Sequence, residues 1–371
     1  MSIVDLPSRR ILLTPGPATT TDTVKLAQVV ADICPREPEF SAVLRSIVAD
    51  LPRLIDAPAD ARAVLLCGSG TAAVEAMIGS LAGSNGLIVV NNGAYGERIL
   101  RMATILGLPV LEFRSDPTAA IDLAELEAVL VERPAGMAQL AIVHHETTTG
   151  LLNDLPAIGA LCDRYNVELL VDAMSSFAAI PIDMTACNIA GLAASANKNL
   201  QGMAGASFVI VRTAALARAK LRPPRSLYLD LVAEHDYFHA QGQMRFTAPV
   251  QTLYALRRAI DEILAESVTG RRHRYDESWA MLIDGLELRG FLPIVPRERQ
   301  SRLITAVDAS AIPGFVFEHL HDYMFARGIT IYPGKLSGRE TFRIANIGAI
   351  DLHDIEQFLA HLDAFLISCR K

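Results

Sequence analysis

The sequence predicts an α/β protein with a large, mostly parallel β-sheet domain and a smaller C-terminal α+β domain. Over residues 1–250, short apolar runs alternate with stretches whose apolar residues recur at spacings of three and four. Beyond residue 250 the order changes to two long helical patterns followed by short apolar runs. A chain of 371 residues has room for two or three domains. We therefore expect one domain over residues 1–250 and a second over 251–371.

The first part of the chain supplies both the helices and the strands of the predicted sheet domain. Strands that alternate with helices form parallel sheets covered on both faces, and ligands then bind at the carboxyl ends of the strands. Helical periodicity covers residues 41–56, 71–81, 95–106, 123–131 and 155–165. Strand-like runs cover residues 87–90, 110–113, 140–144, 167–171, 191–195 and 207–211.

The C-terminal part predicts a small α+β unit that is joined through helices. A long helix is expected at residues 251–267 and a charged helix from about residue 271 to before Gly290, and a final amphipathic helix at 352–366 closes the chain. Strands are expected near residues 303–307, 329–331 and 341–345. The basic cluster at 271–274 precedes two acidic residues, a pattern typical of a solvated helix face.

Composition excludes several classes of protein. With 51% hydrophobic residues, 20% charged residues and a net charge of −7, the chain has the composition of a globular protein without a nucleic-acid partner. No apolar run reaches the ~18 residues of a membrane span, and the N-terminus lacks a secretory signal, so we expect a cytoplasmic protein. The five cysteines are scattered without metal spacing, and the adjacent His144 and His145 on a strand would point to opposite faces. We expect no metal site.

Lysine is scarce, which limits where amine chemistry can occur. Only Lys25, Lys198, Lys220, Lys335 and Lys371 are present among 34 basic residues. Lys198 follows a strand-like run that ends in small polar residues. A lysine at the mouth of a parallel sheet forms a Schiff base when its ammonium is partly desolvated. The alternative is an ordinary surface lysine just past a strand.

Two further segments support amine chemistry at Lys198. Asp172 ends the apolar strand before it, where a carboxylate can serve either a cofactor ring nitrogen or the cap of the next turn. Residues 68–71, Gly-Ser-Gly-Thr, stand directly before an amphipathic helix, where free N–H groups and the helix dipole bind phosphate. This turn matches neither a dinucleotide fingerprint nor a P-loop, and a plain helix cap is its alternative.

Six segments follow one another in the order found in the class V aminotransferases, which the chain resembles from about residue 12 to its last helix. The resemblance implies a fold-type I enzyme that uses pyridoxal 5′-phosphate and works as a homodimer with shared active sites, to which residues 1–20 contribute. Further segments, such as 13–17 and 245–249, narrow the resemblance to a branch that moves the amino group of 2-aminoethylphosphonate to pyruvate. The six segments are 68–71 (GSGT), 92–96 (NGAYG), 145–150 (HETTTG), 171–176 (VDAMSS), 195–198 (SANK) and 342–348 (FRIANIG).

The resemblance assigns roles to individual residues around the cofactor. Lys198 matches the Schiff-base lysine, and Asp172 matches the partner of the pyridine nitrogen. Thr247 is expected to reach the phosphate from the neighbouring subunit. The residues of the phosphate cradle in the same subunit are Ser69, Gly70 and Thr71.

Four more residues are assigned to the ring and to the substrate. Tyr95 stands where the family places an aromatic ring over the cofactor, and Thr147 where it hydrogen-bonds the phenolic oxygen. Arg343 matches the arginine that binds the acidic group of the substrate, because a guanidinium fork suits both carboxylate and phosphonate. Arg36 is expected to contact a substrate anion.

The resemblance leaves rival functions open. An alanine:glyoxylate or serine:pyruvate transaminase of the same class would share every cofactor residue. A cysteine desulfurase needs a nucleophilic cysteine late in the chain, and only Cys369 follows Cys187. A cofactor-binding regulator would need a fused DNA-binding domain or a basic face, which the sequence does not offer.

Overall fold

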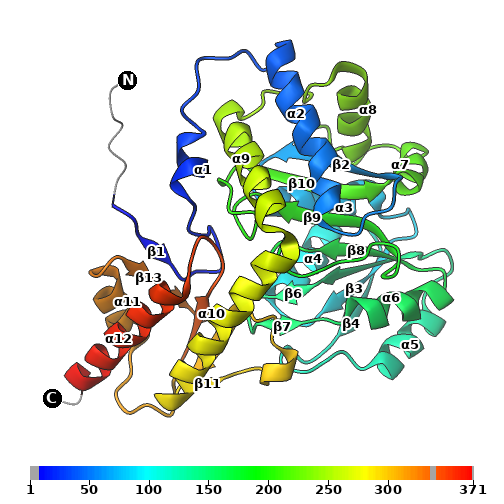
Figure 1. Cartoon of the computed structure of the whole chain (residues 1–371). Helices are drawn as coiled ribbons and strands as arrows, with labels where there is room; N and C mark the ends of the chain where they lie inside the picture. The colour runs from blue at the N-terminus through cyan, green and yellow to red at the C-terminus, as the bar shows by residue number, and fades with distance from the viewer. Residues whose placement is uncertain (1–7, 335–339, 370–371) are drawn as a thin grey trace.

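The computed structural model describes residues 8–334 and 340–369 and is built on a seven-stranded sheet (Figure 1). Five neighbouring strands, β9-β8-β5-β3-β4, run parallel, whereas β10 is antiparallel to both of its neighbours, β2 and β9. The prediction of a mostly parallel sheet is therefore confirmed. In spatial order the strands are β2 (Ala61–Cys67), β10 (Ala206–Arg212), β9 (Ile189–Ser195), β8 (Glu168–Asp172), β5 (Gln139–Val143), β3 (Leu87–Asn91) and β4 (Val110–Arg114).

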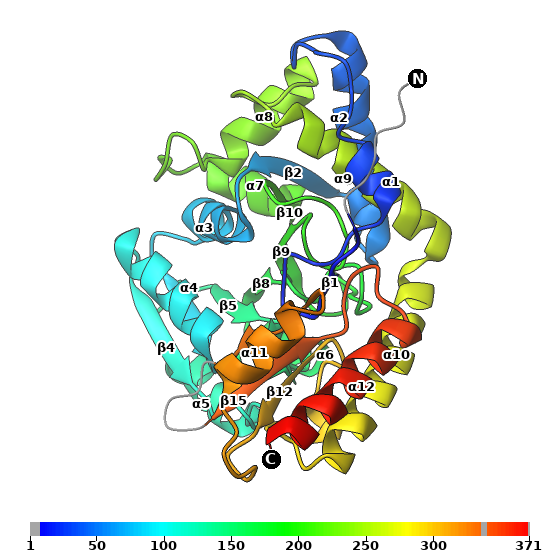
Figure 2. The ribbon, with the colours of Figure 1, turned by 90° about the vertical axis from the view of Figure 1, so that its left-hand side faces the viewer.

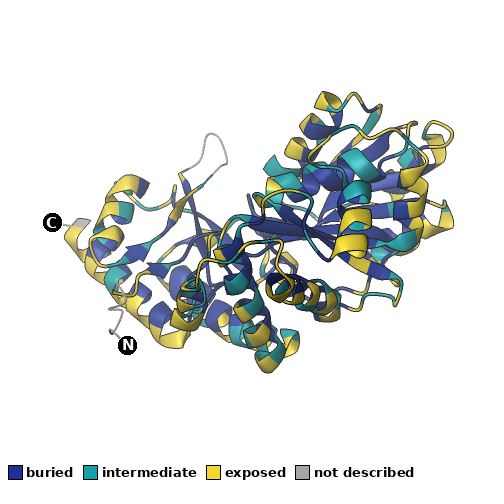
Figure 3. Cartoon of the chain, turned by 90° about the horizontal axis from the view of Figure 1, so that it is seen from above, coloured by how far each residue is buried: buried dark blue, intermediate teal, exposed yellow. Residues whose placement is uncertain are grey.

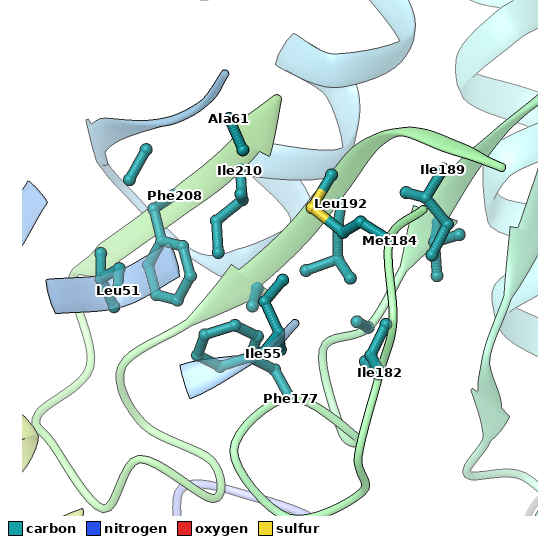
Figure 4. Packing of buried hydrophobic residues seen from close by; sticks show 14 of the residues in the cluster. Leu51, Ile55, Ala61, Phe177, Ile182, Met184, Ile189, Leu192, Phe208 and Ile210 are labelled. Atoms are coloured by element: carbon teal, nitrogen blue, oxygen red, sulfur yellow. The ribbon is translucent and has the colours of Figure 1, made fainter. Parts of the chain in front are cut away.

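Helices cover both faces of this sheet because successive strand residues point to opposite sides. On β3, for example, Ile88 and Val90 belong to one hydrophobic cluster and Leu87 and Val89 to the other. The first cluster, part of which is shown in Figure 4, includes residues of α2 (Pro38–Asp50), α5 (Leu123–Glu132), α6 (Leu155–Arg164) and α9 (Val250–Glu266). The second includes residues of α3 (Gly70–Leu81), α4 (Ala94–Ile105), α7 (Thr213–Lys220) and α8 (Leu231–Gln241).

A second, four-stranded antiparallel sheet lies toward the C-terminus. It has the order β11-β12-β15-β14 and packs with the last helices around a separate core (Figures 1 and 2). In Figure 3 dark blue buried residues run through both sheets, while the outer helix faces are yellow. The strands of this second sheet and the helices around it are α10 (Val268–Leu288), β11 (Leu292–Pro293), a 3-10 helix (Arg297–Arg299), β12 (Ile304–Asp308), α11 (Phe317–Phe325), β14 (Tyr332–Pro333), β15 (Thr341–Ala345) and α12 (Leu352–Cys369).

The N-terminal segment connects the two sheets. Strand β1 (Ile11–Leu12) pairs in parallel with β13 (Ile329–Thr330), and the short helix α1 (Asp22–Leu26) follows. The expected strand near 329–331 therefore exists, but its partner is β1, and only β14 after it joins the four-stranded sheet. A two-stranded hairpin of β6 (His145–Glu146) and β7 (Leu151–Leu152) completes the described elements.

Two sequence expectations were wrong in detail. The helix expected over residues 41–56 ends at Asp50, because the chain tightens into a 3-10 helix, Leu51–Leu54, with Pro52 in its first turn. Arg271 is only 2% exposed and does not lie on a solvated face. It pairs with Glu266, 2.7 Å away, and donates to the backbone oxygen of Asn199 at 2.6 Å. The acidic partner, Glu266, precedes the arginine in the sequence, whereas the two acidic residues on the helix follow it.

No helix in the described ranges is long and apolar enough to cross a membrane. Lys335 and Lys371, two of the five lysines, fall outside those ranges.

Candidate active site

Strand order brings the predicted catalytic residues to one edge of the large sheet. Strands β8 and β9 are adjacent and parallel, and Asp172, at the end of β8, is paired with Ala193 of β9. Lys198 follows the end of β9 by three residues. The carboxylate and the amine therefore emerge at the same edge, as ligand-binding groups do in open α/β sheets.

A cavity of about 480 Å³ lies at this edge, within the usual size range of small-molecule sites. Its floor is the buried Asp172, and its rim includes the exposed Ser69 and Thr71. The predicted site residues that line it are Ser69, Gly70, Thr71, Tyr95, Asp172 and Lys198. Six residues from four separate segments of the sequence thus meet in one space.

The start of α3 forms one side of the cavity and offers groups suited to hold a phosphate. Ser69 is the N-cap of α3, and its side chain makes no capping hydrogen bond, so its hydroxyl is available to a ligand together with the first N–H groups of the helix. Gly70 lets Met174 pack closely against the start of the helix, because a Cβ here would stand 2.2 Å from the methionine sulfur and the side chain would have to shift. Arg98 adds positive charge at this side, with Nη1 3.5 Å from Thr71 Oγ1.

Burial has shifted the pKa values of both reactive groups. Burial lowers the pKa of Lys198, which favours the neutral amine, while Tyr95 and Asp172 act in the opposite direction. Burial raises the pKa of Asp172 to about 6, and the N–H of Met174 donates to its Oδ1 at 2.9 Å. Among the described residues Asp172 has no ion-pair partner. A protonated ring nitrogen in the cavity would supply the missing cation.

Arg343 lies beside the cavity as a buried cation. Its Nε donates to the Pro333 carbonyl at 3.0 Å and its Nη1 to the Thr147 carbonyl at 3.3 Å, while its Nη2 has no hydrogen-bond partner in the described structure. Burial lowers the pKa of Arg343, and the side chains of Tyr95 and Tyr332 oppose this shift. A buried guanidinium that donates to neutral carbonyl oxygens and forms no ion pair in the described structure is suited to bind an anion.

Thr147 is also placed for a ligand. Its hydroxyl is buried and has no partner in the described structure, an arrangement that folded proteins rarely keep without a function. The Thr147 carbonyl contacts Arg343, which links the β6–β7 turn to β15. The orphaned hydroxyl, the uncompensated Asp172 and the open helix N-terminus together fit a planar cofactor that carries a phosphate.

Four predicted residues do not line this cavity in the same chain, namely Thr147, Arg343, Thr247 and Arg36. Thr247 is exposed on the segment between α8 and α9. Arg36 donates to the carbonyl oxygens of Met244 and Arg245 at 2.6 and 3.1 Å, and so holds the segment that leads to Thr247.

Glu146 belongs to the segment 145–150, has no predicted role, and supports the site through its contacts. Its buried carboxylate accepts hydrogen bonds from the N–H of Tyr95 at 3.1 Å and from Thr148. Burial raises the pKa of Glu146, and these donors oppose the shift. It thereby ties the start of α4 to the turn that carries Thr147. The only feature of the sequence that could have indicated this role is a glutamate directly before three threonines.

The two adjacent histidines are buried and neutral. Burial lowers the pKa of both His144 and His145 to about 3. His144 Nδ1 lies 2.9 Å from the hydroxyl of Ser176. Within the described part of the chain, no three metal-binding side chains are grouped around one point.

Comparison with known proteins agrees with this geometry. The family described as Aminotransferase class-V matches residues 25–345. The chain is 43% identical to a 2-aminoethylphosphonate--pyruvate transaminase of Aeromonas hydrophila, over 92% of this chain and 90% of the relative. It is 40% identical to the Klebsiella pneumoniae protein of the same name, over 95% and 96% of the two chains. The crystal structure of an alanine--glyoxylate aminotransferase from Nostoc sp. superposes with a TM-score of 0.89 at 26% identity, covering 99% of this chain and 97% of that one.

Proposed function

The chain belongs to the class V aminotransferases, and on that premise we propose that it transfers the amino group of 2-aminoethylphosphonate to pyruvate. The products are phosphonoacetaldehyde and L-alanine, which makes the reaction a step in phosphonate catabolism. Relatives that carry this name match more than nine-tenths of the chain. The observation that carries the proposal is Arg343, a buried guanidinium close enough to Lys198 to affect its pKa, whose Nη2 has no hydrogen-bond partner among the described residues.

The cofactor that fits the cavity is pyridoxal 5′-phosphate. When bound, it takes up the amino group and withdraws electrons from the substrate carbon that loses a proton. Asp172 would hold its ring nitrogen, Thr147 its phenolic oxygen and Tyr95 the face of its ring. Its phosphate would be held by Ser69, Gly70 and Thr71 at the N-terminus of α3.

Lys198 provides the acid–base chemistry. Because burial favours its neutral form, Nζ is able to accept the proton from the substrate carbon that carries nitrogen and to release it again within the same half-reaction; it makes the reverse transfer when pyruvate is aminated. Lys198 is the covalent attachment point that the family order assigns to the cofactor.

Arg343 serves both halves of the reaction. The donor presents a phosphonate and the acceptor a carboxylate, and both enter the same pocket in turn. A guanidinium fork forms two parallel hydrogen bonds with either group. Arg343 is pre-positioned by the Pro333 and Thr147 carbonyls, so it does not need to be ordered when substrate binds.

We also propose a homodimer in which Thr247 completes the phosphate site of the partner. Its exposure in the single chain, next to the exposed ring of Phe246, supports this arrangement. Arg36 then positions the Thr247 segment. The division into a sheet domain of residues 1–250 and a domain of residues 251–371 remains part of the proposal.

A second candidate is an alanine:glyoxylate transaminase, favoured by the structural likeness to the Nostoc enzyme. A donor panel with pyruvate or glyoxylate as acceptor separates the two. We expect kcat/KM for 2-aminoethylphosphonate with pyruvate to exceed that for L-alanine or L-serine with glyoxylate by at least about 100-fold, the range that a buried polar contact supplies. A preference for L-alanine with glyoxylate would establish the second candidate and remove the first.

A further inference from the structure

The amine of Lys198 has a specific backbone partner outside the large sheet. Its Nζ donates a hydrogen bond to the carbonyl oxygen of Pro15 at 2.6 Å. Pro15 is buried, and 183 residues separate it from Lys198 in the sequence. The contact therefore exists only because the N-terminal segment folds back across the sheet edge (Figure 2).

The turn that presents this carbonyl is fixed from both sides. On the side of the C-terminal elements, Leu13 donates to the Thr330 carbonyl at 2.9 Å and accepts from the Ala345 N–H at 3.1 Å. On the side of the large sheet, the N–H of Ala18 donates to the carbonyl of Asn197, the residue before Lys198, at 3.0 Å. The carbonyl is thus held in register with the residues that flank the lysine.

Gly16 shows how closely the turn and the lysine pack. A Cβ at Gly16 would stand 2.4 Å from both Cδ and Nζ of Lys198, closer than any real contact allows. Its φ of +131° also disfavours a side chain. The lysine side chain therefore lies directly on the backbone of this residue.

We propose that the Pro15 carbonyl positions the catalytic amine whenever Lys198 is not covalently attached. One N–H of the neutral amine donates to this oxygen, which leaves the nitrogen lone pair free to accept the substrate proton. No bond is formed or broken at Pro15. This assignment rests on the proposed function, since it gives the carbonyl a task within transamination.

Replacement of Gly16 by alanine tests the assignment. We expect G16A to lower kcat by about 100-fold, the cost of misplacing a catalytic group by about 1 Å, with KM for the amino donor within about twofold because Arg343 is untouched. A second readout uses the protein without cofactor and measures the acetylation of Lys198 by peptide mass spectrometry, normalised to that of the exposed Lys220. We expect this ratio to be about fivefold higher in G16A than in the wild type, because the amine has lost one hydrogen bond.

The matched control is G314A, which also substitutes a glycine of positive φ, +70°, but with no atom within 4 Å of the added Cβ. It should leave kcat and the labelling of Lys198 unchanged. If Lys198 of the G16A variant were acetylated to the same extent as in the wild type, the proposal would be overturned, even if the activity of the variant fell.

Thr14→Val provides a second test should G16A fold poorly. It removes the 3.1 Å hydrogen bond from Thr14 Oγ1 to the Pro17 carbonyl that closes the turn. We expect the same direction of change in labelling and kcat, about fivefold each. No change in either quantity would contradict the positioning role. If the wild-type protein showed the expected labelling but no turnover of 2-aminoethylphosphonate, the proposed function would fail while the contact to Lys198 stood.

Discussion

Replacement of Lys198 by alanine is expected to reduce transamination by at least about 10⁴-fold, the upper end of what a positioned acid–base group contributes. No other described amine is available to replace it. Lys25 is paired with Asp22 on α1, and Lys220 is paired with Asp236 at the end of α7. The measurement is alanine formation from pyruvate with saturating donor and added pyridoxal 5′-phosphate.

Lys220→Ala is the matched control, because it removes the same functional group from an exposed position. It should retain wild-type activity. A Lys198→Ala protein that folds normally and keeps more than about a hundredth of the activity would be incompatible with the acid–base role given to this residue.

Replacement of Arg343 by lysine is expected to lower kcat/KM by about 10- to 100-fold with 2-aminoethylphosphonate and with pyruvate alike. A lysine keeps the charge but loses the fork, and the lost charge-assisted hydrogen bond is worth about 1.5–3 kcal/mol. The pairings of Arg343 Nε with Pro333 and of Nη1 with Thr147 would also be lost. Steady-state kinetics in which each substrate is varied separately measure both effects.

Arg289→Lys provides the control. Arg289 makes a bidentate pair with Asp363 at the surface, at 2.7 and 2.6 Å. Its kinetics should match the wild type. If Arg343→Lys affected only one of the two substrates, the other would need a different anion partner. Unchanged kinetics with both would remove Arg343 from the site.

Much of the large sheet was predictable because burial on both faces leaves a strong local pattern. Four apolar residues in a row mark β3, and all five residues of the strand are buried. The antiparallel direction of β10 was not predictable, because strand direction depends on the connection that follows β9 and not on the apolar residues of β10. The end of α2 was missed since a 3-10 turn continues the same apolar spacing.

The convergence of Lys198 and Asp172 was predictable, because their motifs follow one another in the order found in the family. Lys198 and Asp172 meet because β8 and β9 are neighbours in the sheet, as consecutive strands often are. The contact of Lys198 with Pro15 joins two positions that are 183 apart in the sequence, and no local pattern encodes it. The substrate contact expected of Arg36 stays a prediction, since in the single chain its guanidinium donates to backbone carbonyls of the Thr247 segment.

The central claim is that this chain moves nitrogen from 2-aminoethylphosphonate to pyruvate. The most direct test uses ¹⁵N-labelled 2-aminoethylphosphonate with unlabelled pyruvate and the purified protein loaded with pyridoxal 5′-phosphate. We predict that mass spectrometry finds ¹⁵N in L-alanine, with one phosphonoacetaldehyde formed for each labelled alanine. Consumption of pyruvate without labelled alanine, or no reaction with this donor while L-alanine and glyoxylate react, would contradict the claim.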